Sequence, residues 1–455
     1  MENDRLSDLW KKYDLGRAFN NSLTPNQYSL VHTNIDFFTG NQWVNLPDTE
    51  AMRSLPKPTF NIIKRVVSLF VASLTSQNAN IYFSPLDNTG QIPAEFATRE
   101  VNNLTEKFKL DYRIRDALYD GAITGDYCAH FFWVPYAEPY GGTLSANRGE
   151  IRMELVDGVN VLFGNPNICD VERQPYIILV GRDWDPEESP RGVTHSLDEK
   201  DKGLYVLLYE KINGTVHASK ATKDKLVFDR VNTGLKRYPV AWGNWEKQKN
   251  SYHGRALVTG IVPNQIYINT MMAMVFRNMM TQSFNKIIYN ADLLPVWNNE
   301  IGQAIGIHNL PPGYDLNQVA TTMKPGDISE QIIYSIDKAM EYTKECLGAT
   351  DVQLGNVTPD NTSALILLQN SSSVPLGNIR AGVHEWVEDI GAILLDLIGT
   401  YYGTRPVAGE SGISEQFDFS VFRSLWFKVR ADIGPMNLNQ YYSTQEGVSN
   451  VEQTE

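Results

Sequence analysis

The most constraining feature of the sequence is a long stretch without acidic residues in an otherwise acidic chain. Between Glu246 and Asp292 there is no Asp or Glu, although the whole chain carries a formal net charge of −13. A helix from Leu257 to Phe284 would be about 40 Å long at ~1.5 Å per residue, which suits a wall or a strut. Its apolar residues recur at helical spacing: Leu257, Ile261, Ile268, Met271, Met272, Val275 and Met279.

The residues after this helix predict a small mixed module and then a second helix. Lys286–Tyr289 is a short β-like run, 297–305 fits a helix of about two to three turns, and 308–313 (HNLPPG) is a break. The second helix begins at Asp327, where Glu330 completes a capping box, and ends at Gly348. One face of this helix carries Ile332, Ile336, Met340, Thr343 and Leu347.

A polar loop and a broken third helix follow. Residues 349–362 (ATDVQLGNVTPDNT) contain Gly355, Pro359 and several Asn, Asp and Thr, which predicts a loop. The segment from Ser363 to Tyr402 is helical again, but Pro375 lies inside it and predicts a bend. Beyond the bend the apolar stripe resumes at Ile379, Val383, Trp386, Val387, Ile390, Leu394 and Leu397.

The first 255 residues have the pattern of one α+β body. Helices are expected at 4–19, 60–74, 94–108 and 112–124, and strands at 80–84, 128–134, 151–155, 176–182 and 204–211. The segment 37–43 (FFTGNQW) is interpreted as an aromatic turn. Strand patterns return late, at 416–419 and 425–432, and the sheet that they need is the body already built. The long helices are therefore an excursion from that body, followed by a polar tail at 434–455.

Composition limits the class of protein. A hydrophobic content of 42% and a charged content of 20% are typical of a globular protein, and 455 residues favour two to four substructures. The acidic balance argues against a protein that finds nucleic acid by charge, but not against one that surrounds DNA. Three widely spaced cysteines suit a reducing compartment. With no signal-peptide layout and no run of ~18 apolar residues, we expect a soluble protein made in a cytoplasm.

Motifs of catalysis and metal binding are absent from the sequence. The seven histidines do not cluster, and there is no H-E-x-x-H, C-x-x-C, G-x-S-x-G or phosphate-binding loop, so we expect no catalytic residue, metal or cofactor. Glu385 with Glu388 or Asp389 could form an acid/base pair, although a solvated or intersubunit face is the favoured interpretation. His130 is interpreted as a satisfied strand histidine. Core packing is favoured over base stacking for Trp43, Trp133, Trp242 and Trp245.

Several stretches, taken in order, resemble the portal proteins of tailed bacteriophages, the head-to-tail connectors. The segment 37–43 resembles their early F/Y-x-G-x-Q-W turn, and 58–67 (PTFNIIKRVV) resembles their P-x-x-x-N-x-I helix entry. The segment 116–133 is similar to their D-A-x-x-x-G-D stretch. His253-Gly254-Arg255 with Pro263, Gln265 and Asn269 is similar to the Y-G-R…P-x-Q…N run before the first stem helix. Residues 355–364 match their G-N…S-A stretch.

The resemblance implies an architecture for the whole chain. It assigns residues 1–255 to an α+β wing, to which the strands at 403–432 return. Residues 256–284 and 327–348 are the first and second stem helices, and 285–326 between them are a small α/β clip. Residues 349–362 are a tunnel loop, 363–402 are a long kinked helix, and 433–455 are a tail or crown remnant. Many family members continue into a helical crown, and here the crown is expected to be minimal or absent.

The resemblance also implies a function and its partners. Portals are twelve-fold rings at one capsid vertex that double-stranded DNA threads during packaging and ejection, without sequence specificity. Implied partners are the terminase large subunit, the head-tail adaptor and the major capsid protein, with no membrane. The protein would assemble in the host cytoplasm and reside in the virion. In this chain the tunnel loop would present polar residues to the DNA, namely Gln353, Asn356, Thr358, Asn361 and Thr362. A plain solvated connector is the alternative for this loop.

Other interpretations remain open from sequence. Lys286 and Lys324, at the clip edges, would meet phosphate or an acidic partner, or have only a structural role. The chain could be another virion or adaptor protein, or a hydrolase with a site in the wing that uses His130 or Glu385. The portal hypothesis depends on an apolar seam around Met271 and Ile336 that neighbouring copies cover, because closed heterologous contacts generate rings.

Overall fold

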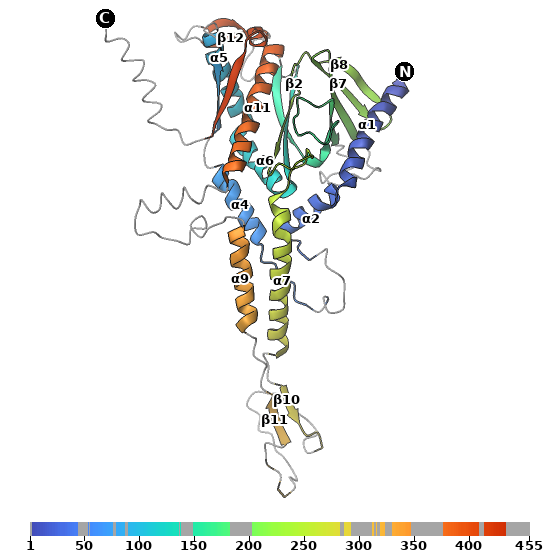
Figure 1. Ribbon diagram of the computed structural model, residues 1–455, viewed down its shortest axis with the longest axis vertical. Helices are drawn as coiled ribbons and strands as arrows, with labels where there is room; N and C mark the ends of the chain where they lie inside the picture. The colour runs from blue at the N-terminus through green and yellow to red at the C-terminus, as the bar shows by residue number, and fades with distance from the viewer. Residues whose placement is uncertain are drawn as a thin grey trace, which may run out of the picture. The chain divides into compact units, whose positions relative to one another are not determined.

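The computed structural model describes residues 2–43, 53, 55–75, 79–86, 90–135, 137, 149–182, 203–282, 286–292, 312–313, 315, 319–323, 330–346, 376–408 and 414–433. The chain mixes helices and antiparallel sheets, which confirms the α+β class (Figure 1). It divides into two compact units. Unit 1 comprises Met1–Thr39, Ile63–Ile261 and Thr350–Glu455, and unit 2 comprises Gly40–Ile62 and Val262–Ala349.

A three-stranded antiparallel sheet lies at the centre of unit 1, in the order β3 (Glu150–Val156), β2 (Asp126–Val134) and β9 (Val240–Asn244). Side chains alternate across β2, as strand geometry requires. Tyr127 packs edge-on against Trp386 of α11 (Gly377–Tyr401), with ring centroids 5.1 Å apart. Phe131, two pleats along, approaches Phe108 at the end of α5 (Gln91–Phe108). Helices α5, α6 (Leu110–Thr124) and α11 therefore cover this face of the sheet.

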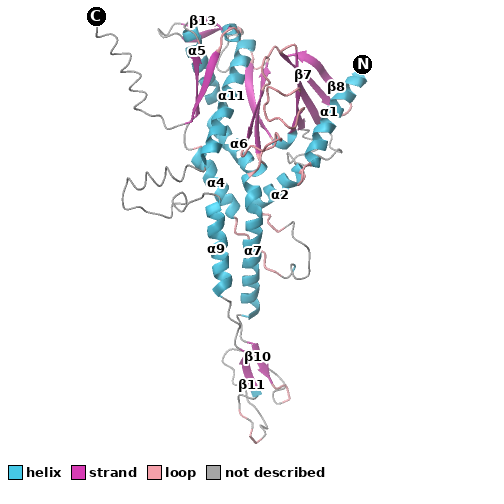
Figure 2. Ribbon diagram, in the orientation of Figure 1, coloured by secondary structure: helices cyan, strands magenta, loops and turns pink. Residues whose placement is uncertain are grey.

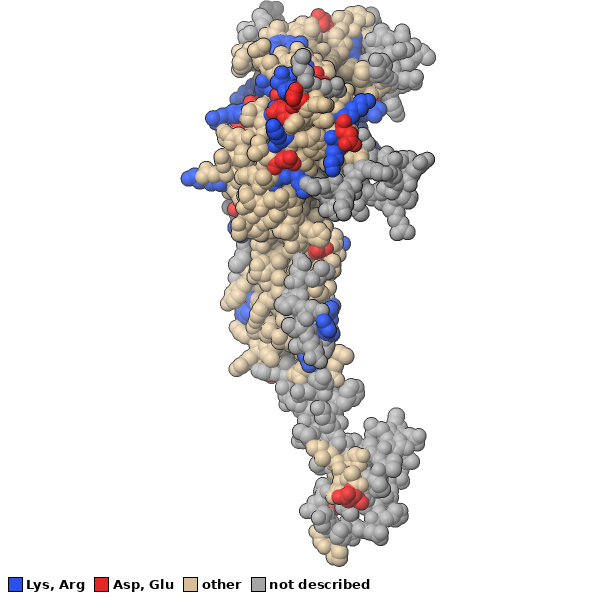
Figure 3. Space-filling model, turned by 90° about the vertical axis from the view of Figure 1, so that its right-hand side faces the viewer, with Lys and Arg blue, Asp and Glu red and all other residues tan. Residues whose placement is uncertain are grey.

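A five-stranded meander faces the other side of that sheet. Its order is β4 (Val161–Phe163), β5 (Tyr176–Arg182), β6 (Leu204–Ile212), β7 (Thr215–Thr222) and β8 (Leu226–Asn232). Helix α1 (Glu2–Ser22) covers its far face with Leu9 and Tyr13, against Ile178 and Leu208. Arg5 of α1 bridges to Asp229 of β8 at 3.1 Å. Figure 3 shows acidic and basic side chains intermixed on this side.

The late strand β14 (Phe427–Ile433) pairs antiparallel with the early strand β1 (Ala79–Pro85). This pairing confirms that the chain returns to its first half after the long helices. Side chains cap both edges of the pair: Asn102 of α5 accepts from Ile81 N–H at 3.1 Å and donates to Ile81 C=O at 3.2 Å. On the other edge Glu388 accepts from Ala431 N–H at 3.3 Å. Neither edge is an open template for another strand.

Two expectations about local structure are wrong. The strand at 416–419 joins no early strand: β13 (Ser414–Asp418) pairs with β12 (Thr404–Ala408), because a nearby strand closes a short loop at little entropic cost. The segment 37–43 is not a turn throughout. Helix α2 (Gln27–Thr39) runs through its first aromatic residues and ends at Gly40, whose φ of 103° is the glycine-favouring left-handed region.

The long helices and several strands whose bounds were predicted agree closely with the structure. Helix α7 (Leu257–Gln282) and strand β10 (Lys286–Tyr289) confirm the strut and the β-like run after it. In unit 2, β10 pairs with β11 (Ala320–Met323), and α9 (Glu330–Cys346) is the second helix (Figure 2). Helix α4 (Ile62–Leu74) confirms the helix at 60–74, and η3 (Gly158–Asn160) and η5 (Phe419–Arg423) are short 3-10 turns. The predicted helix at 297–305, the loop at 349–362 and the first part of the third helix lie outside the described residues.

Candidate functional site

Most of the predicted DNA-facing residues lie outside the described residues and stay predictions. This holds for Gln353, Asn356, Thr358, Asn361 and Thr362, as well as for Lys324 and the kink residue Pro375. Lys286 begins β10, where it pairs in register with Met323 of β11.

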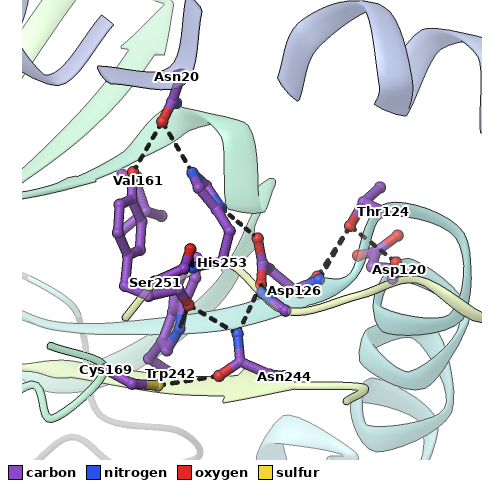
Figure 4. A network of polar contacts seen from close by, with 12 residues as sticks. Asn20, Asp120, Thr124, Asp126, Val161, Cys169, Trp242, Asn244, Ser251 and His253 are labelled. Carbon is purple, nitrogen blue, oxygen red and sulfur yellow. Dashed lines mark hydrogen bonds and ion pairs between the residues drawn. The ribbon is translucent and has the colours of Figure 1, made fainter. Parts of the chain in front are cut away.

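The structure brings two of the quoted motifs together in a buried polar cluster of unit 1 (Figure 4). Asp126, which follows Gly125 at the start of β2, accepts three hydrogen bonds. The donors are His253 Nδ1 at 2.5 Å, Gly254 N–H at 2.6 Å and Asn244 Nδ2 at 2.6 Å. Asp126 and His253 are only 1% and 2% exposed. We call Asp126, His253, Gly254, Asn244 and Asn20 the clamp; it fixes the residues just before α7.

His253 is held on both sides of its ring. Nδ1 faces the Asp126 carboxylate, and Nε2 lies 2.9 Å from Asn20 Oδ1 at the end of α1. Both ring nitrogens therefore lie within hydrogen-bond distance of an oxygen atom, so the orientation of the ring is fixed. Tyr252, whose hydroxyl donates to Asn20 Oδ1 at 3.2 Å, packs against the His253 ring at 4.0 Å between centroids. Buried polar side chains need such a complete set of hydrogen-bond partners.

The motif glycines let the two backbones of the clamp meet. Gly125 has φ of 101°, and a Cβ on it would lie 2.5 Å from Gly254 O. A Cβ on Gly254 would in turn lie 2.6 Å from Gly125 O. Any larger residue at either position would force the strand and the start of α7 apart. Asn20, Asn244 and Cys169, whose Sγ contacts Asn244 Oδ1 at 2.9 Å, were missed by the sequence reasoning, since nothing in their local pattern marks a buried partner.

Three further motif stretches meet in unit 2. Gln42 accepts from Asn269 Nδ2 at 2.6 Å, and Asn269 accepts from Gln265 Nε2 at 2.9 Å. Gln265 also holds the backbone before α4, since it donates to Phe60 C=O at 2.7 Å and accepts from Ile62 N–H at 3.1 Å. All three amides are buried. The stretches at 37–43, 58–67 and 263–269 are therefore parts of one hydrogen-bonded support for the first half of α7.

The residues considered for catalysis have structural partners instead. His130 is buried between Glu154, 2.7 Å from Nδ1, and Tyr209, 2.8 Å from Nε2, which confirms a satisfied strand histidine. Glu385 is exposed and pairs with Lys247 at 2.6 Å. Trp242 and Trp245 are buried, as core packing requires. Among the described residues no group of His, Cys, Asp or Glu could hold a metal ion. No helix of the described chain is long and apolar enough to cross a membrane.

Helices α7 and α9 touch each other and still leave apolar side chains in solvent. Tyr267 of α7 and Ser335 of α9 are hydrogen-bonded at 2.9 Å. Ile336 is only 4% exposed within a single copy of the chain. The expectation that neighbouring copies cover Ile336 is therefore wrong. Its own chain covers it, because the apolar stripe of α9 faces the rest of unit 2. Met271 is half-buried. The exposed large apolar side chains of the two helices are others: Tyr267, Met274, Met279 and Met280 on α7, and Ile333, Tyr334 and Tyr342 on α9.

Comparison with known proteins agrees with the motifs. Residues 184–408, just under half of the chain, match the family model described as the phage P22-like portal protein. No curated protein sequence gives a significant match. The motif stretches at 37–43, 58–67 and 116–133 precede the matched segment, and those from His253 to Ala364 lie inside it. The resemblance drawn from the sequence is thereby confirmed: the chain is similar to the phage portal proteins, the head-to-tail connectors of bacteriophage virions.

Proposed function

We propose that this chain forms a ring of twelve copies at one capsid vertex, through which double-stranded DNA enters during packaging and leaves during ejection. The ring would dock the terminase large subunit and later the head-tail adaptor, and would sit in the major capsid protein shell. The family match carries this proposal. The protein would contribute no ATP chemistry, in agreement with a sequence that lacks a phosphate-binding loop.

The parts of the ring follow from the family architecture. Residues 1–255 and 403–432 form the wing, 256–284 and 327–348 the stem, 285–326 the clip, 349–362 the tunnel loop and 363–402 the kinked helix. The pairing of β1 with β14 supports a wing built from both ends of the chain. The two long helices α7 and α9 support a stem.

The exposed side chains of the stem helices support assembly. Met280 is 69% exposed and Tyr334 is 64% exposed, with five further large apolar residues exposed on the same two helices. Large exposed apolar side chains concentrated on two helices support an interface there. A heterologous contact between α7 of one copy and α9 of the next would cover these side chains, and it closes into a ring if the rotation is right.

The tunnel loop would touch DNA without holding it. Its candidate contact residues are short and uncharged, namely Gln353, Asn356, Thr358, Asn361 and Thr362. Such side chains can contact the phosphate backbone, but they are uncharged and release no counterions from the DNA. They therefore do not add the electrostatic affinity that would oppose translocation. The net charge of −13 acts in the same direction.

Negative-stain imaging of the purified protein tests the proposal. We expect end-on views of a closed ring with a central hole. The test variant carries Met274→Gln and Met280→Gln, which remove apolar contacts at the exposed stem face. It should form fewer rings than the wild type, with an unchanged circular dichroism spectrum. Isolated particles without a central hole, in every condition in which the protein stays folded, would contradict the proposed function.

A further inference from the structure

The outer edge of β3 differs from the edges of two other sheets in unit 1. β3 lies at one side of the central sheet and pairs with β2 in unbroken register over seven residues, from Glu150 to Val156. Side chains of α5 and α11 close both edges of the β1–β14 pair. Register shifts interrupt the pairing of β8, an edge strand of the meander, with β7. Capped or irregular edges reject a further strand, whereas a regular edge accepts one.

Backbone groups along the outer edge of β3 have no hydrogen-bond partner among the residues that the structure describes. Phe131 N–H of β2 donates to Pro239 C=O, on the side of β9, at 2.9 Å. Because successive residues of a strand bond to opposite neighbours, the even-numbered residues of β2 bond to β3. They lie opposite even-numbered residues of β3, so Ile151, Met153 and Leu155 direct their N–H and C=O groups away from β2. These groups form a template for a further strand.

The charged side chains of β3 do not close this edge. Glu150, Arg152 and Glu154 share one face of the strand, since side chains alternate along it. Glu154 lies 2.7 Å from His130 Nδ1 on the neighbouring strand. Glu150 accepts from Lys107 Nζ at 2.9 Å and from Arg152 Nε at 2.6 Å. In the described part of the chain, none of the three side chains bonds to an outer N–H or C=O group of β3.

Two hollows flank β3. The first, of about 240 Å³, is lined by residues 150–153 together with Lys107, Phe108 and Arg113 of α5 and α6. The second, of about 220 Å³, is lined by residues 154–157 together with residues of β5 and β6 in the meander. Every residue of β3 therefore borders open space. Neighbouring strands lie only about 4.8 Å apart, so this space suits a single extended segment.

Charge distinguishes the two hollows. Four charged side chains line the first, and three of them, Lys107, Arg113 and Arg152, are cations that face the single carboxylate of Glu150. Arg113 is exposed and has no ion-pair partner among the described residues. The charged side chains of the second hollow are the carboxylates at 154 and 157. A segment that lies along both hollows is therefore favoured when its acidic residues lie beside the first.

We propose that the outer edge of β3 binds an extended acidic segment of a partner protein as a fourth strand of the central sheet. The partner is a polypeptide because an extended backbone presents donors and acceptors at the spacing of the outer groups of β3. A second copy cannot use its own β3 edge for this contact, because that edge is set back in the same two hollows. The inference goes beyond the ring and does not depend on it, since the edge lies within unit 1 of one copy.

Binding of a defined peptide to the full chain tests the inference. The probe is a fluorescein-labelled peptide in which two glutamates precede alternating threonine and valine, and its binding is measured by fluorescence anisotropy. Met153→Pro removes an outward N–H but no bond to β2, because proline is tolerated where the N–H of an edge strand points outward. Met153→Leu keeps that N–H and is the matched control. A third variant, Lys107→Gln with Arg113→Gln, removes two cations of the first hollow.

We expect saturable binding by the wild type and by Met153→Leu, and a dissociation constant raised about tenfold by Met153→Pro. The third variant should bind about threefold more weakly than the wild type and with a smaller dependence on salt. The same peptide N-methylated at alternate residues cannot donate to the strand and should not bind. If Met153→Pro fails to fold, the N-methylated peptide makes the same test without any change to the protein.

Hydrogen exchange then locates the bound peptide. The amides of Met153 and Leu155 should gain protection, while those of Arg152 and Glu154, which already bond to β2, should change little. A probe that does not bind the wild type, or an N-methylated probe that binds equally well, would overturn the inference. So would protection confined to other strands, or displacement of the peptide by duplex DNA. None of these outcomes bears on ring formation, so the proposed function is tested separately.

Discussion

Asp126 shows how one side chain fixes the local geometry of unit 1. Its carboxylate receives three donors within 2.6 Å, one of them from a residue 127 positions away in the sequence. Each donor is buried, so none could find water if the carboxylate were removed. The sequence indicated Gly125-Asp126 and His253-Gly254 as separate motifs. That the two touch depends on the sheet that brings β2 and β9 together, which no local pattern encodes.

Replacing Asp126 is predicted to be severely destabilising. Asp126→Ala leaves the His253 ring and two further donors buried without an acceptor, which should lower the free energy of unfolding by about 3–5 kcal/mol. The change is measured by urea unfolding. Asp224→Ala, on the exposed hairpin between β7 and β8, is the control and should change stability by less than about 0.5 kcal/mol. A loss below about 1 kcal/mol for Asp126→Ala would show that the clamp is not a tight set of buried partners.

Asp120 gives a pH dependence with a defined sign. Burial, together with the charges of Asp157 and Asp116, raises its pKa to about 7 from 3.8. The folded protein therefore holds this proton more tightly than the unfolded chain does, and the stability contribution falls as pH rises from about 4 to about 7. Asp120→Asn removes the penalty. It should raise the free energy of unfolding by on the order of 1–3 kcal/mol at pH 8, with little gain at pH 4.

The comparison is made by urea unfolding at both pH values. Asp224→Asn serves as the control, since its side chain is exposed and should show no such difference. An equal gain at pH 4 and pH 8 would mean that the charge of Asp120 is not the cause.

At the scale of elements, long periodic helices were predicted best and pairings worst. Helix α7, strand β10 and strand β5 lie within two residues of their predicted bounds, because hydrophobic periodicity and turn residues encode them locally. Helix α2 was missed, since FFTGNQW suggested a turn and only Gly40 in fact breaks the helix. The partner of β13 was wrong because pairing depends on loop closure rather than on the strand's own pattern.

The capped edge of β1 is an element-scale feature that can be tested with a neighbouring control. Asn102→Ala leaves Ile81 N–H and C=O without their partner and should cost about 1–3 kcal/mol of stability. Glu95→Ala, on the same helix but exposed, should cost less than about 0.5 kcal/mol. The two variants are compared by thermal and urea unfolding. Equal effects would show that the edge caps contribute nothing specific.

Buried and exposed side chains of the stem helices are expected to affect folding and assembly differently. Ile336 is covered within its own chain, so Ile336→Ala should lower the stability of the isolated protein by about 2–5 kcal/mol. Tyr334→Ser alters a side chain that is 64% exposed and should leave stability nearly unchanged while weakening assembly. Unfolding curves and assembly titrations of the two variants check this division. A Tyr334→Ser protein that loses stability but assembles normally would reverse the assignment of the two faces.

At the scale of the whole molecule, the likeness to phage portal proteins rests on the match over residues 184–408, and the ring is the proposal that most needs a measurement. The DNA-facing loop could not be tested, since its residues lie outside the described ones. What the described helices contribute is large exposed apolar side chains on α7 and α9. A closed assembly would give these side chains a physical use, because neighbouring copies would cover them.

The mass distribution of the purified protein, taken by mass photometry across protein concentration and salt, tests the ring most directly. Twelve chains of 51.3 kDa predict a dominant species of about 620 kDa. A single species at 51.3 kDa under every condition would contradict the ring and the function proposed for it.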